Sequence, residues 1–595
     1  MSLQQESRFD LPGFTLPLLY TKREYNDNNS LFPNALDFEE DAYDGFLYTF
    51  REILMMRVMN TITDKPDWDR KVFDESITNK WRQEVSESGQ DISKAMMDWI
   101  IKELQWKTEG LKKDGIISVF DTGVVKSDNA IPKDLKQQLI EAVAPFEDVP
   151  DDQKDYHPGT DNKVLDLVHQ SLFAVVYGRT YILRDKLIGL NDCLNYVGQG
   201  EVLPVTPKPA PAQRYSRGHV PDALSHKFQW LPCDVEFVGS EPACRITSYI
   251  NNVHPIEHKG LYGVVEKIID RAIPLWNKSL APPSQMGQRI PYGEDIKYVD
   301  GSEDTEPRQG EDEDEEVYWD RHEVWQAARK IELPEPNVNS FKPPNQPSFR
   351  ERVDLRENFK DSGLQIIVKL ANIELTTENP EYDGGSWHIE GQLNERICAT
   401  AIYYYDSENI TQSTLSFRHR AGKDLADDFY YEQGRHEFLQ QVYGFPGSGT
   451  DFGDSPDGIT QDLGGVVCRE DRLLTFPNVL QHRVSPFSLA DRSKPGHRKI
   501  LALFLIDPNV RIISSANVPP QQEEWSQGRR KLIDGLLGER LPAELQEIVR
   551  QDLPMPVMSL EEAKKYRLEL MKERSVKSED HNQGFTRGEF SLCEH

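Results

Sequence analysis

The sequence predicts an α+β protein with a jelly-roll core of antiparallel strands, a large helical addition before the core and a smaller one after it. Eight short segments between residues 364 and 507 are rich in strand-forming residues, and no long helical pattern separates them. Apolar residues recur at helical spacing from about 42 to 180 and again from 521 to 578. Short strands that follow one another in this way favour two facing antiparallel sheets.

Length and composition indicate an ordinary globular chain that is too long for one simple core. The 595 residues are 37% hydrophobic and 28% charged, and they fit either two domains or one enlarged domain. We expect four segments, namely an N-terminal arm and helical region (1–225), a hairpin, helix and acidic loop (226–363), the jelly-roll core (364–507) and C-terminal helices with a tail (508–595).

Several classes of function are disfavoured by composition. A formal net charge of −30 argues against a broad nucleic-acid footprint. The sequence contains no run of about 18 apolar residues, and its first residues lack the pattern of a secretory signal. The six cysteines are scattered, without a CxxC pair. We therefore expect a cytoplasmic protein that binds neither membranes nor nucleic acid, while its oligomeric state stays open.

The first half of the chain is expected to be mainly helical. Proline residues and an Asn-rich cluster predict an extended arm over residues 1–40. The helical stripes that follow lie at 46–59, 96–104, 135–143 and 164–175. A Pro-rich loop (200–225), a hairpin (228–238 and 245–250), a helix (255–275), an acidic, disordered loop (301–316) and a Pro/Asn-rich linker (333–348) come next.

The second half of the chain carries the predicted strands. They are 364–375, 386–391, 396–405, 414–417, 465–469, 472–476, 480–484 and 499–506. Helical pieces follow at 532–537, 545–549 and 560–570, and the tail from 575 is expected to be poorly ordered.

The strand region contains three residues suited to binding a divalent metal. Side chains at positions i and i+2 of a strand face the same way, so His388 and Glu390 point together. His482 lies in the predicted strand 480–484 and can supply a third ligand. Two histidines and one carboxylate form the facial triad of non-haem Fe(II) sites, which leaves three coordination positions open. A His-x-Glu pair alone is a weak signal, and its context strengthens it.

That context resembles a known superfamily. The segments Gly-Ser-Trp-His-Ile-Glu-Gly (385–391) and Thr-Phe-Pro-Asn-Val-Leu-Gln-His-Arg-Val (475–484) look like the double-stranded β-helix of Fe(II)/2-oxoglutarate-dependent oxygenases. The resemblance covers roughly residues 364–507. Over its full length the chain is also similar to a large fungal family of unknown function that carries this core.

The resemblance implies further residues for binding 2-oxoglutarate. Arg498 fits the basic residue that holds the far carboxylate of this cosubstrate, because it leads directly into an apolar strand. Arg492 is a rival, since it lies ten residues after His482, a common spacing in the superfamily. Tyr404 corresponds to a tyrosine that donates a hydrogen bond to 2-oxoglutarate, although it can equally be a core aromatic residue. The chain departs from the usual pattern in two ways. It has Glu390 in place of the commoner Asp, and the interval between His482 and Arg498 is long.

The same resemblance implies an activity. With Fe(II), 2-oxoglutarate and dioxygen, such an enzyme oxidises a C–H bond of a small molecule, for example an amino acid or a secondary metabolite. Hydroxylation is expected, with desaturation or oxidative cyclisation as competing outcomes. The carboxylate of Glu390 disfavours halogenation, because halogenating relatives lack it. The alternatives are a non-catalytic jelly-roll protein that binds partners and a non-haem iron oxygenase that does not use 2-oxoglutarate.

One other metal motif occurs in the sequence. His254, Glu257 and His258 form the pattern HxxEH of inverted zinc proteases. Pro255 between the two histidines indicates the start of a helix rather than a pair of ligands on one helix. We therefore disfavour a zinc site there.

Overall fold

The fold is described by a computed structural model. It covers residues 31–37, 46–205, 222–239, 243–281, 289–290, 292, 296–299, 305–343, 353–422, 431, 435–445, 458–526, 542, 545 and 557–586. In this part of the chain, no helix combines the length and the apolar character that crossing a membrane requires.

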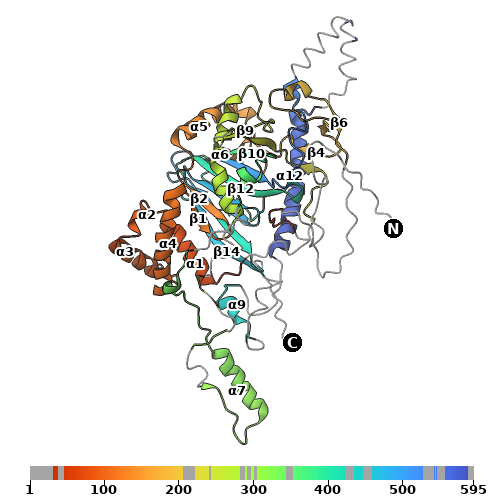
Figure 1. Ribbon diagram of the computed structural model, residues 1–595. Coiled ribbons are helices and arrows are strands. Elements are labelled where there is room, and N and C mark those ends of the chain that lie inside the picture. Colours follow the sequence, from red (N-terminus) through yellow and green to blue (C-terminus); the bar gives the residue numbers. More distant parts are fainter. Residues whose placement is uncertain are drawn as a thin grey trace.

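A large antiparallel sheet forms the centre of the protein (Figure 1). Its nine strands run in the order β1-β2-β15-β12-β18-β10-β8-β9, and β3 pairs with β10 beside this path. The bounds are β1 (Ile117–Phe120), β2 (Val124–Ser127), β3 (Val164–Val168), β8 (Cys233–Val238), β9 (Ala243–Ile246), β10 (Leu364–Leu375), β12 (Ile397–Glu408), β15 (Leu473–Pro477) and β18 (Gly496–Ile506).

A second antiparallel sheet has three strands in the order β14-β13-β16. These are β13 (Thr414–Arg420), β14 (Thr460–Val467) and β16 (Gln481–Val484). A single bridge between His388 and His482 attaches the segment before Glu390 to the edge strand β16. Short strand pairs are β11 (Glu381–Tyr382) with β17 (Phe487–Ser488), β4 (Val175–Val176) with β7 (Phe228–Gln229), and β5 (Tyr181–Ile182) with β6 (Glu201–Val202).

Alternate residues of β18 enter two different cores, as the pleat of a strand requires. Leu501, Leu503 and Leu505 pack against helices α5 (Lys133–Glu147) and α6 (Lys259–Leu280) on the outer face of the large sheet. Ala502 and Phe504 face a core that also contains side chains of the three-stranded sheet. We call this side of the large sheet the inner face.

Helices α1 (Phe50–Thr63) and α4 (Lys94–Asp114) complete the inner core from the side of β14. Thr49 starts α1 with a capping box: its hydroxyl accepts the backbone N–H of Glu52, whose carboxylate accepts the N–H of Thr49. The other helices are α2 (Trp68–Lys71), α3 (Glu75–Glu87), α7 (Glu315–Ala328), α8 (Leu355–Asn358), α9 (Glu437–Gln441) and α12 (Leu560–Thr586). Short 3-10 helices occur at Asp151–Gln153, Cys193–Tyr196, Val338–Ser340, Leu393–Glu395 and Glu523–Ser526.

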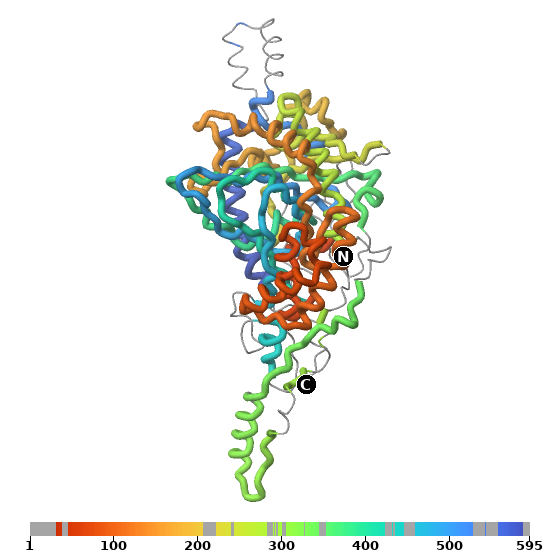
Figure 2. The backbone as a smooth tube through the Cα atoms, turned by 90° about the vertical axis from the view of Figure 1, so that its left-hand side faces the viewer, coloured from red at the N-terminus to blue at the C-terminus, as the bar shows by residue number. Residues whose placement is uncertain are grey.

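Two helices occupy very different positions. The C-terminal α12 runs along the sheets and buries Ala563 and Leu570 in the inner core. By contrast, α7 projects from the body of the molecule (Figure 2), and Trp319 on it is 51% exposed. The C-terminal helix is therefore part of the packed domain, whereas α7 is an arm.

The predicted mixture of helices and antiparallel strands is confirmed. The pairing of the strands forms two separate sheets and does not by itself establish a closed jelly roll. The predicted hairpin is present as β8 and β9, and the helix after it is α6.

Several predictions about local structure need correction. Residues 575–586, which were expected to be poorly ordered, belong to α12. The predicted strand 386–391 is not a strand, because it forms only a single bridge at His388. The predicted helical stripe 164–175 is wrong, because residues 164–168 form β3 and residues 175–176 form β4. Asp166 lies in the middle of an alternating strand, and the apolar residues around it satisfied a helical spacing by chance. The acidic segment is described from residue 305 and leads into α7 at Glu315. The arm 1–30, the Pro-rich loop 206–221 and the helical piece 532–537 lie outside the described residues.

Candidate metal centre

The backbone brings His388 and His482 together although 94 positions separate them in the numbering. The N–H of His388 donates to the carbonyl of His482 at 3.2 Å, and the N–H of His482 donates to the carbonyl of His388 at 3.1 Å. Glu390 is held by Asn478, which accepts the Glu390 N–H at Oδ1 (3.1 Å) and donates from Nδ2 to the Glu390 carbonyl (3.1 Å). The turn before β16 therefore fixes the backbone of Glu390 relative to both histidines.

The three side chains converge on one point. Oε1 of Glu390 lies 3.7 Å from Nε2 of His388 and 3.3 Å from Nε2 of His482, and the three ligand atoms all lie within 4.8 Å of one another. Two atoms that each lie about 2.1 Å from one ion, at right angles, are about 3 Å apart. The spacing therefore fits one divalent cation with little adjustment.

Hydrogen bonding aims the correct nitrogen of His388 at this point. Its Nδ1 lies 2.9 Å from the carbonyl oxygen of Ser386. A carbonyl oxygen only accepts, so Nδ1 carries a proton and the neutral ring presents its lone pair at Nε2. A donated bond from the second ring nitrogen is the usual support of a metal-binding histidine.

The local charges also suit a cation. Burial alone would raise the pKa of Glu390, but hydrogen bonds to His388 and His482 hold it far below its usual range, so the carboxylate is ionised. Burial lowers the pKa of His388, and the contact with Glu390 more than offsets this, so the net pKa is raised. For His482 burial prevails and the pKa is lowered. An ionised carboxylate between two imidazoles is a favourable donor set for Fe(II) or Zn²⁺.

Aromatic rings close the inner side of the triad. The ring centroid of His482 lies 4.7 Å from that of Phe476 and 6.4 Å from that of Phe417. On the other side, the guanidinium groups of Arg418 and Arg483 lie 4.8 and 4.5 Å from the Trp387 ring centroid. The side chain of His388 remains 38% exposed, so the centre is buried on one side and open to solvent on the other.

Arg498 lies on the inner face, near the start of β18, and is 3% exposed. Its Nη1 donates to the hydroxyl of Ser413 at 2.5 Å, and its guanidinium lies 5.7 Å from the ring of Tyr404 and 4.9 Å from that of Phe487. Its Nε has no hydrogen-bond partner among the described residues. A buried guanidinium with a free N–H is suited to bind a carboxylate.

Tyr404 is buried beside Arg498. The thiol of Cys468 donates to its hydroxyl oxygen at 3.1 Å, which leaves the phenol proton for another acceptor. Burial raises the pKa of Tyr404 well above its usual value, so the phenol stays protonated and can act as a donor.

The rival arginine lies elsewhere. Arg492 is 63% exposed and pairs with Glu381 at 2.5 Å on the surface. Of the two arginines, only Arg498 is buried on the inner face.

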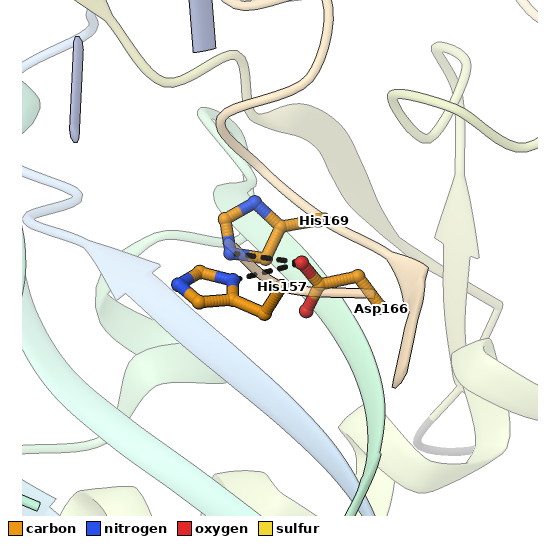
Figure 3. Close-up of side chains that lie close together, drawn as sticks. All are labelled: His157, Asp166 and His169. Atoms are coloured by element: carbon orange, nitrogen blue, oxygen red, sulfur yellow. Dashed lines mark hydrogen bonds and ion pairs between the residues drawn. The ribbon is translucent and has the colours of Figure 1, made fainter. Parts of the chain in front are cut away.

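A second cluster of two histidines and a carboxylate was missed from the sequence. Figure 3 shows His157, Asp166 and His169 around one carboxylate. Oδ2 of Asp166 lies 2.8 Å from Nδ1 of His157 and 3.9 Å from Nε2 of His169, and the ligand atoms lie within 4.8 Å of one another. The incorrect helix prediction gave no reason to consider Asp166. In the structure this residue lies on strand β3, opposite Ala371 of β10, and points to the inner face.

The hydrogen bonds of this second cluster differ. The backbone N–H of Ser171 donates to Nδ1 of His169 at 3.1 Å, so a neutral His169 carries its proton on Nε2, the nitrogen that faces Asp166. Arg567 of α12 places Nη1 3.9 Å from the same carboxylate. A protonated nitrogen and a nearby guanidinium disfavour a metal ion, and we interpret this cluster as a hydrogen-bonded group.

The inverted zinc motif does not assemble. Nδ1 of His254 accepts the backbone N–H of Glu257 at 3.2 Å, and the ring of His258 stacks on Phe146 with centroids 4.2 Å apart. Within the described residues only the two clusters above have metal-ligand spacing. A surface cleft of about 930 Å³ between α4, α5 and α6 contains none of their side chains, so we do not connect it with the chemistry.

Comparison with known proteins identifies a family but no activity. A family model described as "Protein of unknown function (DUF4246)" matches residues 94–529, and its N-terminal counterpart, described as "Domain of unknown function DUF4246, N-terminal", matches residues 11–84. No curated protein matches the chain.

Solved structures are similar only at a distance. IDO from Bacillus thuringiensis is 12% identical, with a TM-score of 0.15 over 30% of this chain and 66% of that one. The Fe(II)/(alpha)ketoglutarate-dependent dioxygenase TqaL is 17% identical, with a TM-score of 0.15 over 28% and 51%. A bsmA homolog from Methylobium petroleophilum PM1 is 8% identical, with a TM-score of 0.20 over 67% and 91%. The chain spans less than two thirds of the first two, and TM-scores this low carry no argument.

Proposed function

The chain belongs to the DUF4246 family, whose description assigns no activity, and we propose that it is an Fe(II)/2-oxoglutarate-dependent oxygenase that oxidises a C–H bond of a small molecule. One observation carries the proposal: His388, Glu390 and His482 converge with the spacing of a single metal ion. The donated bond from His388 to Ser386 supports it, because it leaves Nε2 as a ligand.

We infer further that the two sheets form a double-stranded β-helix. Along the chain, β10, β12, β15 and β18 belong to the large sheet, while the segment at His388, β13, β14 and β16 belong to the small one. Side chains of both sheets, among them Phe504 from the large and Leu463 from the small, share one core. This alternation and this shared core support two facing sheets, with the triad at the edge of the small one.

Each polar residue near the triad then has a role. Bound Fe(II) would be held by the triad and would supply the activation of dioxygen, for which three open coordination positions are needed. Arg498 binds the far carboxylate of 2-oxoglutarate through Nε and the other free N–H groups of its guanidinium. Ser413 holds the guanidinium in place by accepting a hydrogen bond from Nη1. Tyr404 donates its phenol proton to the same molecule.

The two alternatives are weaker. An iron oxygenase that does not use 2-oxoglutarate leaves the buried Arg498 without a partner for Nε. The alternative that the protein binds a partner is supported by helix α7, on which the apolar residues Trp319 and Val324 are 51% and 72% exposed. Because this arm projects away from the body (Figure 2), binding a partner there is compatible with catalysis.

Anaerobic titration tests the proposal. Fe(II) and 2-oxoglutarate should produce a visible charge-transfer band in the wild-type protein, and Glu390→Ala should abolish it. Arg498→Ala should raise the 2-oxoglutarate concentration needed for half of the band at least tenfold, because it removes a charge-assisted bond of about 1.5–3 kcal/mol. Arg492→Ala is the matched control and should leave that concentration unchanged.

Failure of the wild-type protein to form the band would refute the use of 2-oxoglutarate. A band weakened by Arg492→Ala instead of Arg498→Ala would move the cosubstrate to the other arginine. Once the band is established, release of succinate in the presence of candidate small molecules identifies the substrate.

A further inference from the structure

Lys369 lies on the inner face of the large sheet, in the middle of β10. It pairs in register with Ala502 of β18, and its neighbours at i−2 and i+2, Ile367 and Ala371, are buried. Ile367 belongs to the same core as Ala502 and Phe504. Since side chains two residues apart in a strand share a face, Lys369 points to the side of the sheet on which Arg498 and Tyr404 lie.

Lys369 has no counter-charge in the part of the chain that the structure describes. It is half-buried, and among the described residues no hydrogen bond or ion pair of its ammonium group is found, although 28% of the chain is charged and acidic side chains predominate. Two other cations are paired with carboxylates: Arg567 donates to Asp155 at 2.5 and 2.9 Å, and Arg574 pairs with Glu395. A half-buried, unpaired ammonium on an inner face is costly unless a ligand pairs with it.

Lys369 also lies beside the cluster of His157, Asp166 and His169. Asp166 is opposite Ala371 on the neighbouring strand β3, one residue pair away along the face. Burial lowers the pKa of His169, and the charge of Lys369 is the next largest cause in the same direction.

We propose that Lys369 binds an anionic group of the substrate, a carboxylate or a phosphate, and so orients the substrate toward the triad. This inference rests on the proposed function for the identity of the reaction. The binding of an anion at Lys369 is a separate claim, because it follows from the position and the missing counter-charge of the side chain. Arg498, which donates to Ser413 just before β13, serves the cosubstrate in the proposed function, and this leaves Lys369 for the second anion.

The test compares the wild-type protein with Lys369→Met, which keeps the length of the side chain and removes its charge, and with Lys369→Arg, which keeps the charge. Thermal unfolding is followed with Mn(II) and excess 2-oxoglutarate present, so that any cosubstrate site is filled. Acetate and inorganic phosphate are the probes, and acetamide at the same ionic strength is the neutral control. The wild-type protein and Lys369→Arg should gain about 1–2 °C from one of the two anions, and Lys369→Met should gain none.

The two anions distinguish a carboxylate from a phosphate group on the substrate. An equal shift in the wild-type protein and Lys369→Met, or no shift in either, would overturn the proposal. The Fe(II)/2-oxoglutarate band of Lys369→Met should equal that of the wild-type protein. Loss of the band in this variant alone would assign Lys369 to the cosubstrate and also overturn the proposal. A band missing from the wild-type protein would refute the oxygenase function, whereas the thermal shifts would still decide whether an anion binds.

Discussion

Two clusters in this chain contain the same set of side chains, two histidines and one carboxylate, and they differ in their hydrogen bonds. In the cluster of His388, Glu390 and His482, a ring nitrogen donates to a backbone carbonyl and the lone pair of the other faces the carboxylate. In the cluster of His157, Asp166 and His169, a backbone N–H donates to the ring of His169. The first arrangement leaves Nε2 of His388 free to bind a metal. The second places a proton on Nε2 of His169, the nitrogen that faces the carboxylate.

The comparison teaches that spacing alone does not make a metal site. Both clusters have ligand atoms within 4.8 Å of one another, so distance does not separate them. The surroundings do: Asn478 fixes the backbone of Glu390, whereas Arg567 supplies a competing positive charge beside Asp166. The second cluster thus ties β3 to α12, whereas Glu390 of the first cluster pairs with no lysine or arginine among the described residues.

The largest expected effect comes from removing a ligand of the first cluster. His482→Ala should lower the affinity for Fe(II) more than 100-fold, because two ligands cannot hold the ion as three do. Asp166→Asn should leave the affinity unchanged and the stoichiometry at one ion per chain. Anaerobic equilibrium dialysis measures both, and a second ion that is lost with Asp166→Asn would contradict the distinction between the clusters.

A second effect concerns stability. Asp166 is fully buried beside His157 and near Arg567, so Asp166→Asn should lower the free energy of unfolding by about 2–4 kcal/mol, as expected when one partner of a buried network is removed. In the metal-free protein, Glu390→Gln should cost less, since His388 is partly exposed. Denaturant unfolding compares the two variants. A larger loss of unfolding free energy for Glu390→Gln than for Asp166→Asn would contradict the interpretation that the cluster of Asp166 is the structural one.

A smaller effect is expected from the support of Glu390. Asn478→Ala removes both bonds that hold the backbone of that residue, so the affinity for Fe(II) should fall about tenfold, the range typical of residues that orient ligands. The circular dichroism spectrum should be unchanged. Asn582→Ala removes two bonds of α12, one donated to the carbonyl of Trp387 and one accepted from the side-chain amide of Gln481. It is the control in a neighbouring contact and should leave the affinity within about twofold, because neither bond is made to a ligand residue.

The smallest effect is a dependence of stability on pH. Burial lowers the pKa of His169 below its unfolded value near 6.5, so the folded state binds fewer protons than the unfolded state when the pH falls below that value. This residue therefore contributes stability above pH 6.5 that is lost on acidification. His169→Gln should flatten the fall in unfolding free energy between about pH 6.5 and 5, and a slope as steep as that of the wild-type protein would contradict the buried, neutral state of His169.

Much of the strand region was predictable, because its local signals agree with its environment. Alternation and β-formers placed β10, β12 and β18 within a few residues of their observed bounds. The segment 164–175 was not predictable in the same way: its apolar residues fit a helical period as well as a strand period, and pairing with β10 decided the outcome. Because β3 was not predicted as a strand, Asp166 and His169 were not recognised as neighbours in a cluster.

The candidate site was only partly predictable. The spacing of His388 and Glu390 implied a shared direction, and the distant His482 was reached through the resemblance of its segment to an iron-binding strand. Ser413 and Lys369 carry no motif, and Asn478 lies in the segment 475–484 without a predicted role, because the roles of all three depend on which segments become neighbours. Arg498 and Arg492 could not be separated by spacing, since the sequence does not show which of them is buried.

The sequence by itself determined the types of ligand and the antiparallel strand content, because these depend on residue chemistry and on the short period of a strand. Only the tertiary structure decided which ring nitrogen carries the proton, which arginine is buried on the inner face and that no described acidic side chain pairs with Lys369. Those properties depend on contacts across strands and on the exclusion of water, and the linear chain contains neither until it folds.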